Sequence, residues 1–443
     1  MLDKIFIYLI ILINMGVLYQ FMRTLPKANR FLCIVLVPLV FYFLNYPLRA
    51  FILINSSDCE YSNDQILWAL VYATIFTIVL LISYKRSVSA GIYNYNHENI
   101  KVNDKDKFVC HVTFVITVTV FSYRMITGEM FGLYEDESAL YDSFSGNFIK
   151  MFDSVKWFCI AACAIIYSIN KQRIYLIELL VTASTIVFGA VASTSKGAIV
   201  ALLLFYLFMK SVQKTRINYF GLFITSIAIY FYMKITYLIR YYGVVRGEFT
   251  LEQMISNYSD LIQFYNANEF TSTTSNSIAN RFNYLDGLIL TIQKFDILSN
   301  GLYSLGSISE LLNIIPRFIW NDRPLINFNI YLTQNIWGYE GIISETPVGR
   351  IGESFLVLGG AGIFYALFYG KLFNLIENKV IEHSSVSYFA MYFVVLYYYV
   401  WSDSHLVFYW KTLLFVTVTV SSIYYLYASI QNKDNKLIAT DES

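Results

Sequence analysis

Eleven apolar runs alternate with shorter polar segments along most of this 443-residue chain. They have roughly the length that a helix needs to cross a hydrocarbon core of about 30 Å. The pattern predicts an all-α, polytopic integral membrane protein with about eleven spans, and a twelfth crossing or a re-entrant half-helix would also fit. The runs cover residues 5–22, 31–46, 66–84, 108–123, 157–169, 174–192, 198–209, 217–233, 353–376, 386–401 and 406–428.

One long segment, residues 236–351, is too polar to lie within a bilayer. It separates an N-terminal group of spans, residues 1–235, from a C-terminal group with a short cytoplasmic tail, residues 352–443. We therefore expect three regions, of which the middle one is a large loop outside the membrane.

The large loop has the pattern of a folded helical region. Apolar residues recur at helical spacing after Thr250, which forms a capping box with Gln253, and the pattern repeats from Ile278. Ser307 begins a third short helix that Pro316 ends. These signals predict a helical cap and not a flexible linker.

Composition narrows the class further. Hydrophobic residues make up 57% of the chain and charged residues 14%, and the mean hydropathy is +0.52, which excludes an ordinary soluble fold. The net charge of +1 gives no electrostatic basis for a nucleic-acid partner. The five cysteines show no metal-ligand spacing, and only Cys59 falls in a predicted external loop. We expect neither a metal site nor a structural disulfide.

Basic residues set the orientation. Lysines and arginines gather in alternate short loops, for example at Lys85 and Arg86 and again at Lys210 and Lys214. Because cytoplasmic loops carry the excess of positive charge, these loops lie inside. The N-terminus and the large loop are then external, and the C-terminus is cytoplasmic.

Several cations nevertheless lie on the predicted external side. Inserting a charged side chain costs about 2.5–3.5 kcal/mol at the bilayer centre, so charged residues near the membrane often have a functional role. One guanidinium group can donate two parallel hydrogen bonds to phosphate oxygens, which suits the diphosphate of a lipid-linked substrate. The same residues also fit a simpler interpretation, as snorkelling or loop-folding cations. The candidate substrate-binding residues are Arg49, Lys196, Arg240, Arg246, Arg281, Arg317, Arg323 and Arg350.

Four short segments occur in a fixed order within this topology. They are residues 195–198 (SKGA), residues 281–287 (RFNYLDG), residues 315–320 (IPRFIW) with Arg323 and Pro324, and residues 352–355 (GESF) ahead of residues 359–362 (GGAG). Together with the many spans and the single large external loop, they resemble Wzy-type O-antigen or oligosaccharide repeat-unit polymerases. The resemblance covers nearly the whole chain.

The resemblance implies a multi-pass glycosyltransferase of GT-C-like architecture in the bacterial inner membrane. Such an enzyme joins undecaprenyl-diphosphate-linked oligosaccharide repeat units at the outer face of that membrane, without a cofactor or an obligatory metal. Its partners would be the lipid bilayer, a flippase and a chain-length regulator. Loop arginines handle substrate in this family, which by position implies Arg240, Arg246, Arg281 and Arg317 here.

A transfer of this kind needs a base near the acceptor hydroxyl. Glu353, where the large loop re-enters the bilayer, is the first candidate, followed by Asp286 and His405. Each has a structural alternative. Glu353 is three residues from Arg350 on one helical face and fits an ion pair with it, Asp286 fits a role in orienting Arg281, and His405 fits a purely structural role in its turn.

Two further patterns are interpreted structurally. Asp104 and Asp106 have the D-x-D spacing of nucleotide-sugar transferases, but their cytoplasmic loop is too short for a nucleotide-binding domain. We interpret them as a solvated charge run. The glycines of residues 359–362 fit close helix packing within a span better than a phosphate loop.

Other functions remain open at this point. A lipid-linked oligosaccharide flippase would share the basic character, but it should show two related halves and no large external region. An O-antigen ligase is closer, because it uses the same donor and transfers the glycan to the lipid A core. A regulatory or scaffolding membrane protein would have no need for so many external arginines.

Overall fold

The structure, a computed structural model, is helical almost throughout the part of the chain that it describes. That part contains no β-strand, and its one β-bridge, between Lys101 and Ser385, is isolated. The predicted all-α class is therefore confirmed. The described residues are 2–25, 33–56, 59–85, 100–127, 152–192, 196–218, 220–232, 283–298, 328–335, 348–401 and 410–441.

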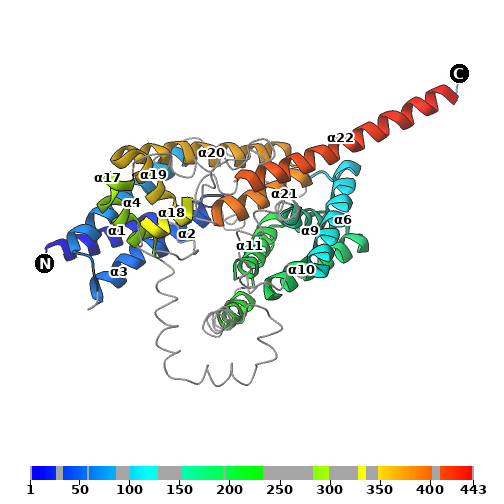
Figure 1. The fold of residues 1–443 in the computed structure, drawn as a ribbon. Coiled ribbons are helices and arrows are strands. Elements are labelled where there is room, and N and C mark those ends of the chain that lie inside the picture. The colour runs from blue at the N-terminus through cyan, green and yellow to red at the C-terminus, as the bar shows by residue number, and fades with distance from the viewer. Residues whose placement is uncertain are drawn as a thin grey trace. The chain divides into compact units, whose positions relative to one another are not determined.

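The chain divides into two compact units, each built from segments far apart in sequence (Figure 1). Unit 1 comprises residues 1–95, 276–382 and 396–411, and unit 2 comprises residues 96–275, 383–395 and 412–443. Unit 1 contains α1 (Leu2–Thr24), α2 (Leu36–Asn45), α3 (Pro47–Asn55), α4 (Asn63–Lys85), α16 (Tyr284–Gln293), α17 (Phe295–Leu298), α18 (Phe328–Asn335), α19 (Gly349–Leu358), the 3-10 turn η4 (Gly359–Gly362), α20 (Ile363–His383) and the π-helical turn η5 (Leu396–Trp401). Unit 2 contains α6 (Asp104–Ile126), α9 (Val155–Asn170), α10 (Arg173–Ala192), α11 (Lys196–Val212), α21 (Val386–Val395) and most of α22 (Trp410–Asp441).

Seven helical stretches among the described residues are long and apolar enough to cross a membrane. Four shorter apolar helices stand where the remaining predicted runs lie, and the total number of crossings stays a prediction. The long stretches are Leu2–Thr24, Leu36–Asn55, Asn63–Tyr84, Asp104–Ile126, Arg173–Ala192, Gly349–His383 and Leu413–Gln431, and the shorter helices are Val155–Asn170, Ala201–Val212, Phe220–Tyr232 and Val386–Tyr398.

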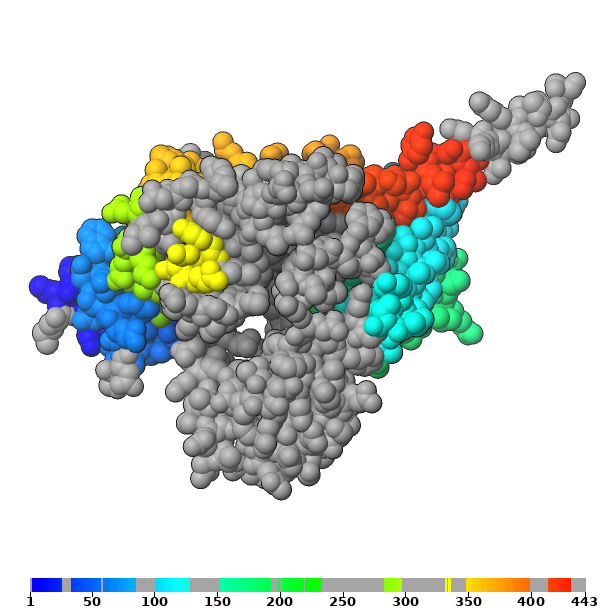
Figure 2. All heavy atoms as spheres, in the orientation of Figure 1, coloured from blue at the N-terminus to red at the C-terminus, as the bar shows by residue number. Residues whose placement is uncertain are grey.

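The outer faces of several long helices are apolar. Leu12 on α1 is 64% exposed, Ile177 on α10 is 59% exposed and Phe364 on α20 is 67% exposed. The helix α6, whose surface is cyan in Figure 2, also exposes large apolar side chains. They include Val115 and Ile126. Water-soluble proteins do not expose so many large apolar side chains, whereas lipid tails solvate them well. The chain is therefore a multi-pass membrane protein.

In unit 1, α4 and α20 pack against each other through a glycine. A methyl group at Gly370 of α20 would lie 2.6 Å from the carbonyl oxygen of Leu80 and 2.7 Å from Cβ of Ser83. Ser83 also donates a hydrogen bond of 2.7 Å to the carbonyl oxygen of Leu367. Small residues at such crossings let membrane helices approach closely.

We expect Gly370→Ala to lower the thermal unfolding midpoint of the purified protein. Alanine is the better helix former by about 1 kcal/mol, but its methyl group would press on the backbone of α4, and overpacking costs about 1–3 kcal/mol. Gly360→Ala is the matched control, because a methyl group there has no atom within 4 Å. Equal midpoints for the two variants would contradict the close approach of these helices.

The glycine segment of residues 359–362 forms the turn between α19 and α20. Gly359 has a φ of +58°, in the left-handed region that favours glycine. A methyl group at Gly362 would collide with the carbonyl oxygen of Ser354 and lie 2.6 Å from the hydroxyl of Tyr72. The packing interpretation fits Gly362, although the segment is a 3-10 turn and not part of a continuous α-helix.

In unit 2, α9 lies beside α6, α10 and α21 (Figure 1). Nearly every residue from Val155 to Ile166 is buried, so α9 forms the core of this unit. The turn after α9 is made by Lys171, which has a φ of 54° and whose N–H bonds to the carbonyl of Tyr167 at 3.0 Å.

The solvated interpretation of the D-x-D segment is wrong for Asp106. The Asp106 side chain is buried, and its Oδ1 accepts hydrogen bonds from Ser387 at 2.7 Å and from Tyr424. Asp104 is exposed and pairs with Lys107, as expected. Asp106 instead ties the first turn of α6 to α21 and α22, where a buried carboxylate needs such donors.

Candidate functional site

A buried ion pair joins α3 to α16 in unit 1. Arg49 donates from Nε to Oδ2 of Asp286 at 2.8 Å and from Nη2 to Oδ1 at 3.0 Å, which is the bidentate geometry of a strong charged pair. The side chains are only 10% and 6% exposed. Pro47 restarts the helix after a break at Tyr46, and this places Arg49 in the first turn of α3.

The start of α19 lies against the same two helices. Gly349 has a φ of +71°, and a methyl group built on it would lie 3.1 Å from Cγ of Tyr284 and 3.2 Å from the hydroxyl of Tyr46. One residue earlier, Val348 contacts Gly287 of α16 closely. The first turns of α3, α16 and α19 therefore meet in one region, which we call the charged corner.

Two more candidate residues are buried on α19. Arg350 and Glu353 lie one helical turn apart and are 7% and 6% exposed. The guanidinium carbon of Arg350 lies 5.8 Å from the ring centre of Tyr369 and 5.9 Å from that of Phe373, both on α20. Such cation–π contacts hold the arginine head inside an apolar shell.

A tyrosine that sequence reasoning did not single out also belongs to the charged corner. Tyr61 lies in the short connection between α3 and α4, outside the spans. Burial raises the pKa of the Tyr61 hydroxyl well above its ordinary value, and the negative charge of Asp286 raises it further. Tyr61 therefore stays neutral and remains a hydrogen-bond donor. In the sequence, only the position of Tyr61 in a predicted external loop could have indicated that it belongs to this site.

The charged corner brings together two of the predicted site residues, Arg49 and Asp286. Two more, Arg350 and Glu353, are buried on α19, whose first residues border the corner. Lys196 begins α11 in unit 2, and its side chain lies outside what the structure describes. The other predicted site residues also lie outside the described ranges, as do the predicted helices after Thr250 and Ser307. They are His405, Arg240, Arg246, Arg281, Arg317 and Arg323.

The structure corrects one expectation about these residues. The span that carries Arg49 was predicted to end near residue 46, whereas α3 continues that apolar stretch to Asn55. Asp286 pairs with Arg49, and Arg281, which Asp286 was suggested to orient, lies outside the described residues. The Arg49–Asp286 pair joins positions 237 residues apart, which no local pattern encodes.

Arg49 and Asp286 balance each other in the corner, and α19 adds one buried cation and one buried acidic residue. The predicted cationic excess therefore depends on the loop arginines outside the described ranges. The corner itself combines a buried ion pair with three helix N-termini, whose N–H groups favour negative charge. Such an arrangement can bind an anion and place a desolvated carboxylate beside it.

No protein-family model, no curated protein and no solved structure matches the chain. The fold defines the class as a multi-pass membrane protein that is all-α in its described residues, and these include a buried charged corner where α3, α16 and α19 meet.

Proposed function

We propose that this protein is a surface-polysaccharide polymerase that joins undecaprenyl-diphosphate-linked repeat units at the outer face of the bacterial inner membrane. The observation that carries the proposal is the meeting of two motif segments. Tyr284 and Gly287 of residues 281–287 pack against Gly349 and Val348 at the start of α19, which follows more than 60 residues later and carries the buried residues Arg350 and Glu353. These are the segments on which the family resemblance depends.

The proposed reaction moves the growing glycan from its lipid carrier to an incoming repeat unit. A hydroxyl of the incoming sugar attacks the anomeric carbon, and a new C–O bond forms. The bond from that carbon to the diphosphate breaks, and undecaprenyl diphosphate leaves with the electron pair. The hydroxyl proton passes to a base on the protein. No co-reactant is needed, because the donor already carries an activated leaving group.

The chain supplies groups for each part of this reaction. The diphosphate gains negative charge as it leaves, and guanidinium groups and helix N-termini stabilise such charge. Arg350 at the start of α19 is one such group, and the loop residues Arg281 and Arg317 are proposed to supply more. Glu353 is the proposed base, because its buried carboxylate lies one turn from Arg350. Arg49 holds Asp286 in the bidentate pair, so Asp286 is the weaker candidate.

The surface glycan of a deletion strain tests this function. A polymerase mutant should display a single repeat unit on the acceptor, because the first unit is still made, flipped and attached. Complete loss of the glycan would point to a ligase or a flippase instead and would overturn the proposal. Complementation with the wild-type chain should restore the full range of chain lengths.

The proposal also requires the large loop to face outward. In a chain whose five native cysteines are replaced, Asn276→Cys should react with a membrane-impermeant maleimide in intact cells, and Lys105→Cys should react only after the membrane is permeabilised. The distribution of basic residues sets this expectation. Labelling of position 105 but not of position 276 would reverse the topology and exclude transfer at the outer face.

A further inference from the structure

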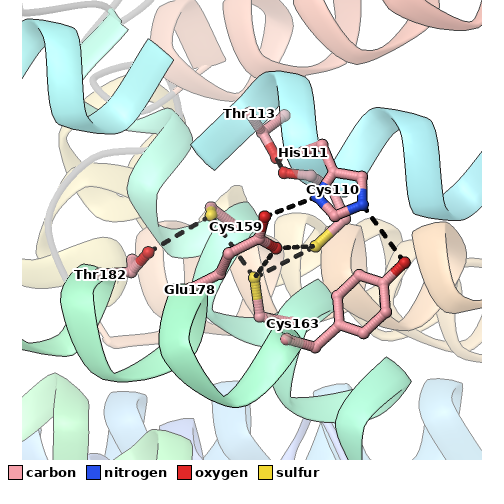
Figure 3. A network of polar contacts seen from close by, with 8 residues as sticks. Cys110, His111, Thr113, Cys159, Cys163, Glu178 and Thr182 are labelled. Atoms are coloured by element: carbon pink, nitrogen blue, oxygen red, sulfur yellow. Dashed lines mark hydrogen bonds and ion pairs between the residues drawn. The ribbon is translucent and has the colours of Figure 1, made fainter. Parts of the chain in front are cut away.

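Unit 2 contains a cluster of three buried thiols and a buried carboxylate, with a partly exposed imidazole at its edge (Figure 3). The Sγ atoms of Cys110 and Cys163 are 3.1 Å apart, and each lies 3.8 Å from Oε2 of Glu178. One ligand atom from each of these three residues lies within 4.8 Å of the other two. Cys159 stands next to the trio, with its Sγ 3.8 Å from that of Cys163.

Three helices build this cluster. Cys159 and Cys163 are four residues apart on α9, so both thiols face the same way, and α6 and α10 contribute Cys110 and Glu178. All three thiols and the carboxylate are buried, and all five cysteines of the chain are free. The cluster lies wholly within unit 2 and is separate from the charged corner of unit 1.

The carboxylate of Glu178 is held in a fixed direction. Its Oε1 bonds to Nδ1 of His111 at 2.5 Å, while its Oε2 faces the two thiols, as Figure 3 shows. Tyr175 in turn stacks on the imidazole, with ring centres 5.2 Å apart, and its hydroxyl lies 3.4 Å from Nε2. Chains of this kind, in which an outer partner orients a ligating group, are typical of metal centres.

The spacing of the ligand atoms suits a tetrahedral cation. With metal–sulfur bonds of about 2.3 Å, the ligand atoms of a tetrahedral zinc site are separated by about 3.5–3.8 Å. The two sulfur–oxygen separations and the Cys159–Cys163 separation are each 3.8 Å, and the Cys110–Cys163 pair would have to open slightly from 3.1 Å. Two thiolates with one carboxylate favour a borderline-soft dication such as zinc over magnesium or calcium.

We propose that Cys110, Cys163 and Glu178 form a binding site for a thiophilic divalent cation of the zinc class, with Cys159 nearest to the fourth position. Two thiolates and a carboxylate carry three negative charges, and a bound dication offsets most of that charge. A buried site cannot hold such charges without this compensation. The bound metal would join α6 to the α9–α10 hairpin and stabilise unit 2.

The orientation of the chain favours a metal over a disulfide. The start of α6 and the α9–α10 turn face the cytoplasm in the predicted topology, and Cys110, Cys163 and Glu178 lie within about two helical turns of these ends. Cytoplasmic thiols are kept reduced, and reduced thiol pairs near a carboxylate are available as metal ligands.

Zinc content tests the site directly. Full-length protein, purified in detergent under reducing conditions without chelator, should contain about one zinc per chain, as one tetrahedral site requires. The Cys110→Ser and Cys163→Ser variants should retain less than a tenth of that amount. Cys33→Ser is the matched control, because Cys33 is also buried but lies in unit 1 beside Tyr84. Its zinc content should equal that of the wild type.

Cobalt substitution identifies the ligands even if a serine variant folds poorly. After chelator treatment, Co²⁺ added to the wild-type protein should give thiolate-to-cobalt charge-transfer absorption, and added Zn²⁺ should remove it. Glu178→Gln, which keeps the shape of the side chain, should weaken Co²⁺ binding at least tenfold, a loss typical of removing an anionic ligand.

Three results would overturn this proposal. They are wild-type protein with no zinc and no cobalt spectrum, equal zinc in the Cys163→Ser and Cys33→Ser variants, and a Cys110–Cys163 disulfide found by mass spectrometry in cells lysed with an alkylating agent. None of these measurements uses a glycan, so their outcome is independent of the proposed polymerase function.

Discussion

Glu353→Gln is expected to reduce polymerisation of purified lipid-linked repeat units by a factor of about 100 or more, the size of effect typical for loss of a general base. Glutamine keeps the shape and the hydrogen-bonding capacity of the side chain but cannot accept the proton of the acceptor hydroxyl. The buried position of Glu353 in the middle of α19 makes the difference large, because water has limited access to substitute for the lost base.

The neighbouring arginine provides the control for this prediction. If Glu353 only balances the charge of Arg350, then Arg350→Gln combined with Glu353→Gln should recover the activity that the single variant loses. If Glu353 is the base, the double variant stays inactive. Recovery would move the assignment of the base to Asp286 or His405. The ratio of kcat to KM should be measured with repeat units at several concentrations, so that weaker binding is not mistaken for slower chemistry.

Arg49→Ala is expected to destabilise the protein by about 3–5 kcal/mol, because removing one partner leaves the other charge buried and uncompensated. Asp286, at 6% exposure, would then be a buried acidic side chain without its cationic partner. The double variant Arg49→Leu with Asp286→Leu should be much closer to the wild type, since apolar residues of similar volume often replace a buried pair at little cost. Thermal unfolding in detergent, followed by loss of monodisperse protein, measures both.

An exposed ion pair serves as the comparison for that experiment. Lys107 and Asp104 lie 2.7 Å apart, but their side chains are 32% and 77% exposed. Lys107→Ala should change stability by less than about 1 kcal/mol, as surface pairs usually do. If Arg49→Ala and Lys107→Ala have equal effects, the Arg49–Asp286 pair does not hold α3 to α16.

The helices of this protein could be predicted from the sequence because the bilayer requires long apolar runs wherever the chain crosses it. The amphipathic pattern around Leu285, Leu288 and Ile289 also predicted the buried face of α16 correctly, since all three residues are buried. The breaks within spans were harder to predict. Tyr46 and Pro47 were interpreted as the end of a span, whereas the helix restarts at once and continues to Asn55.

The contacts of the charged corner could be predicted only in part. The three-residue spacing of Arg350 and Glu353 indicated that both lie on one face of a helix, which is α19. Nothing local could pair Arg49 with Asp286, because that contact depends on how α3 and α16 pack. The burial of Asp106 could not be predicted for the same reason, since its partners Ser387 and Tyr424 come from the other end of the chain.

Only part of the thiol cluster leaves a pattern in the sequence. The four-residue spacing of Cys159 and Cys163 places two thiols on one helical face, and this pattern alone does not indicate a metal site. The remaining members, Cys110 and Glu178, join only through the packing of α6 and α10 against α9. Motif searches with fixed Cys–Cys spacing do not detect ligands that three helices supply one at a time.

The turn at Lys171 and Gln172 ties α9 to α10 during synthesis as well as in the finished molecule. If α10 entered the lipid alone, it would present Glu178 to the hydrocarbon less than two turns from the start of the helix, where a charge costs less than the about 2.5–3.5 kcal/mol at the bilayer centre. α9, with only 16 residues, is also a poor insertion signal by itself. Leaving the translocon as a hairpin covers the carboxylate before lipid can reach it. The biogenesis of this protein therefore depends on a connection of two residues as well as on its most apolar helices.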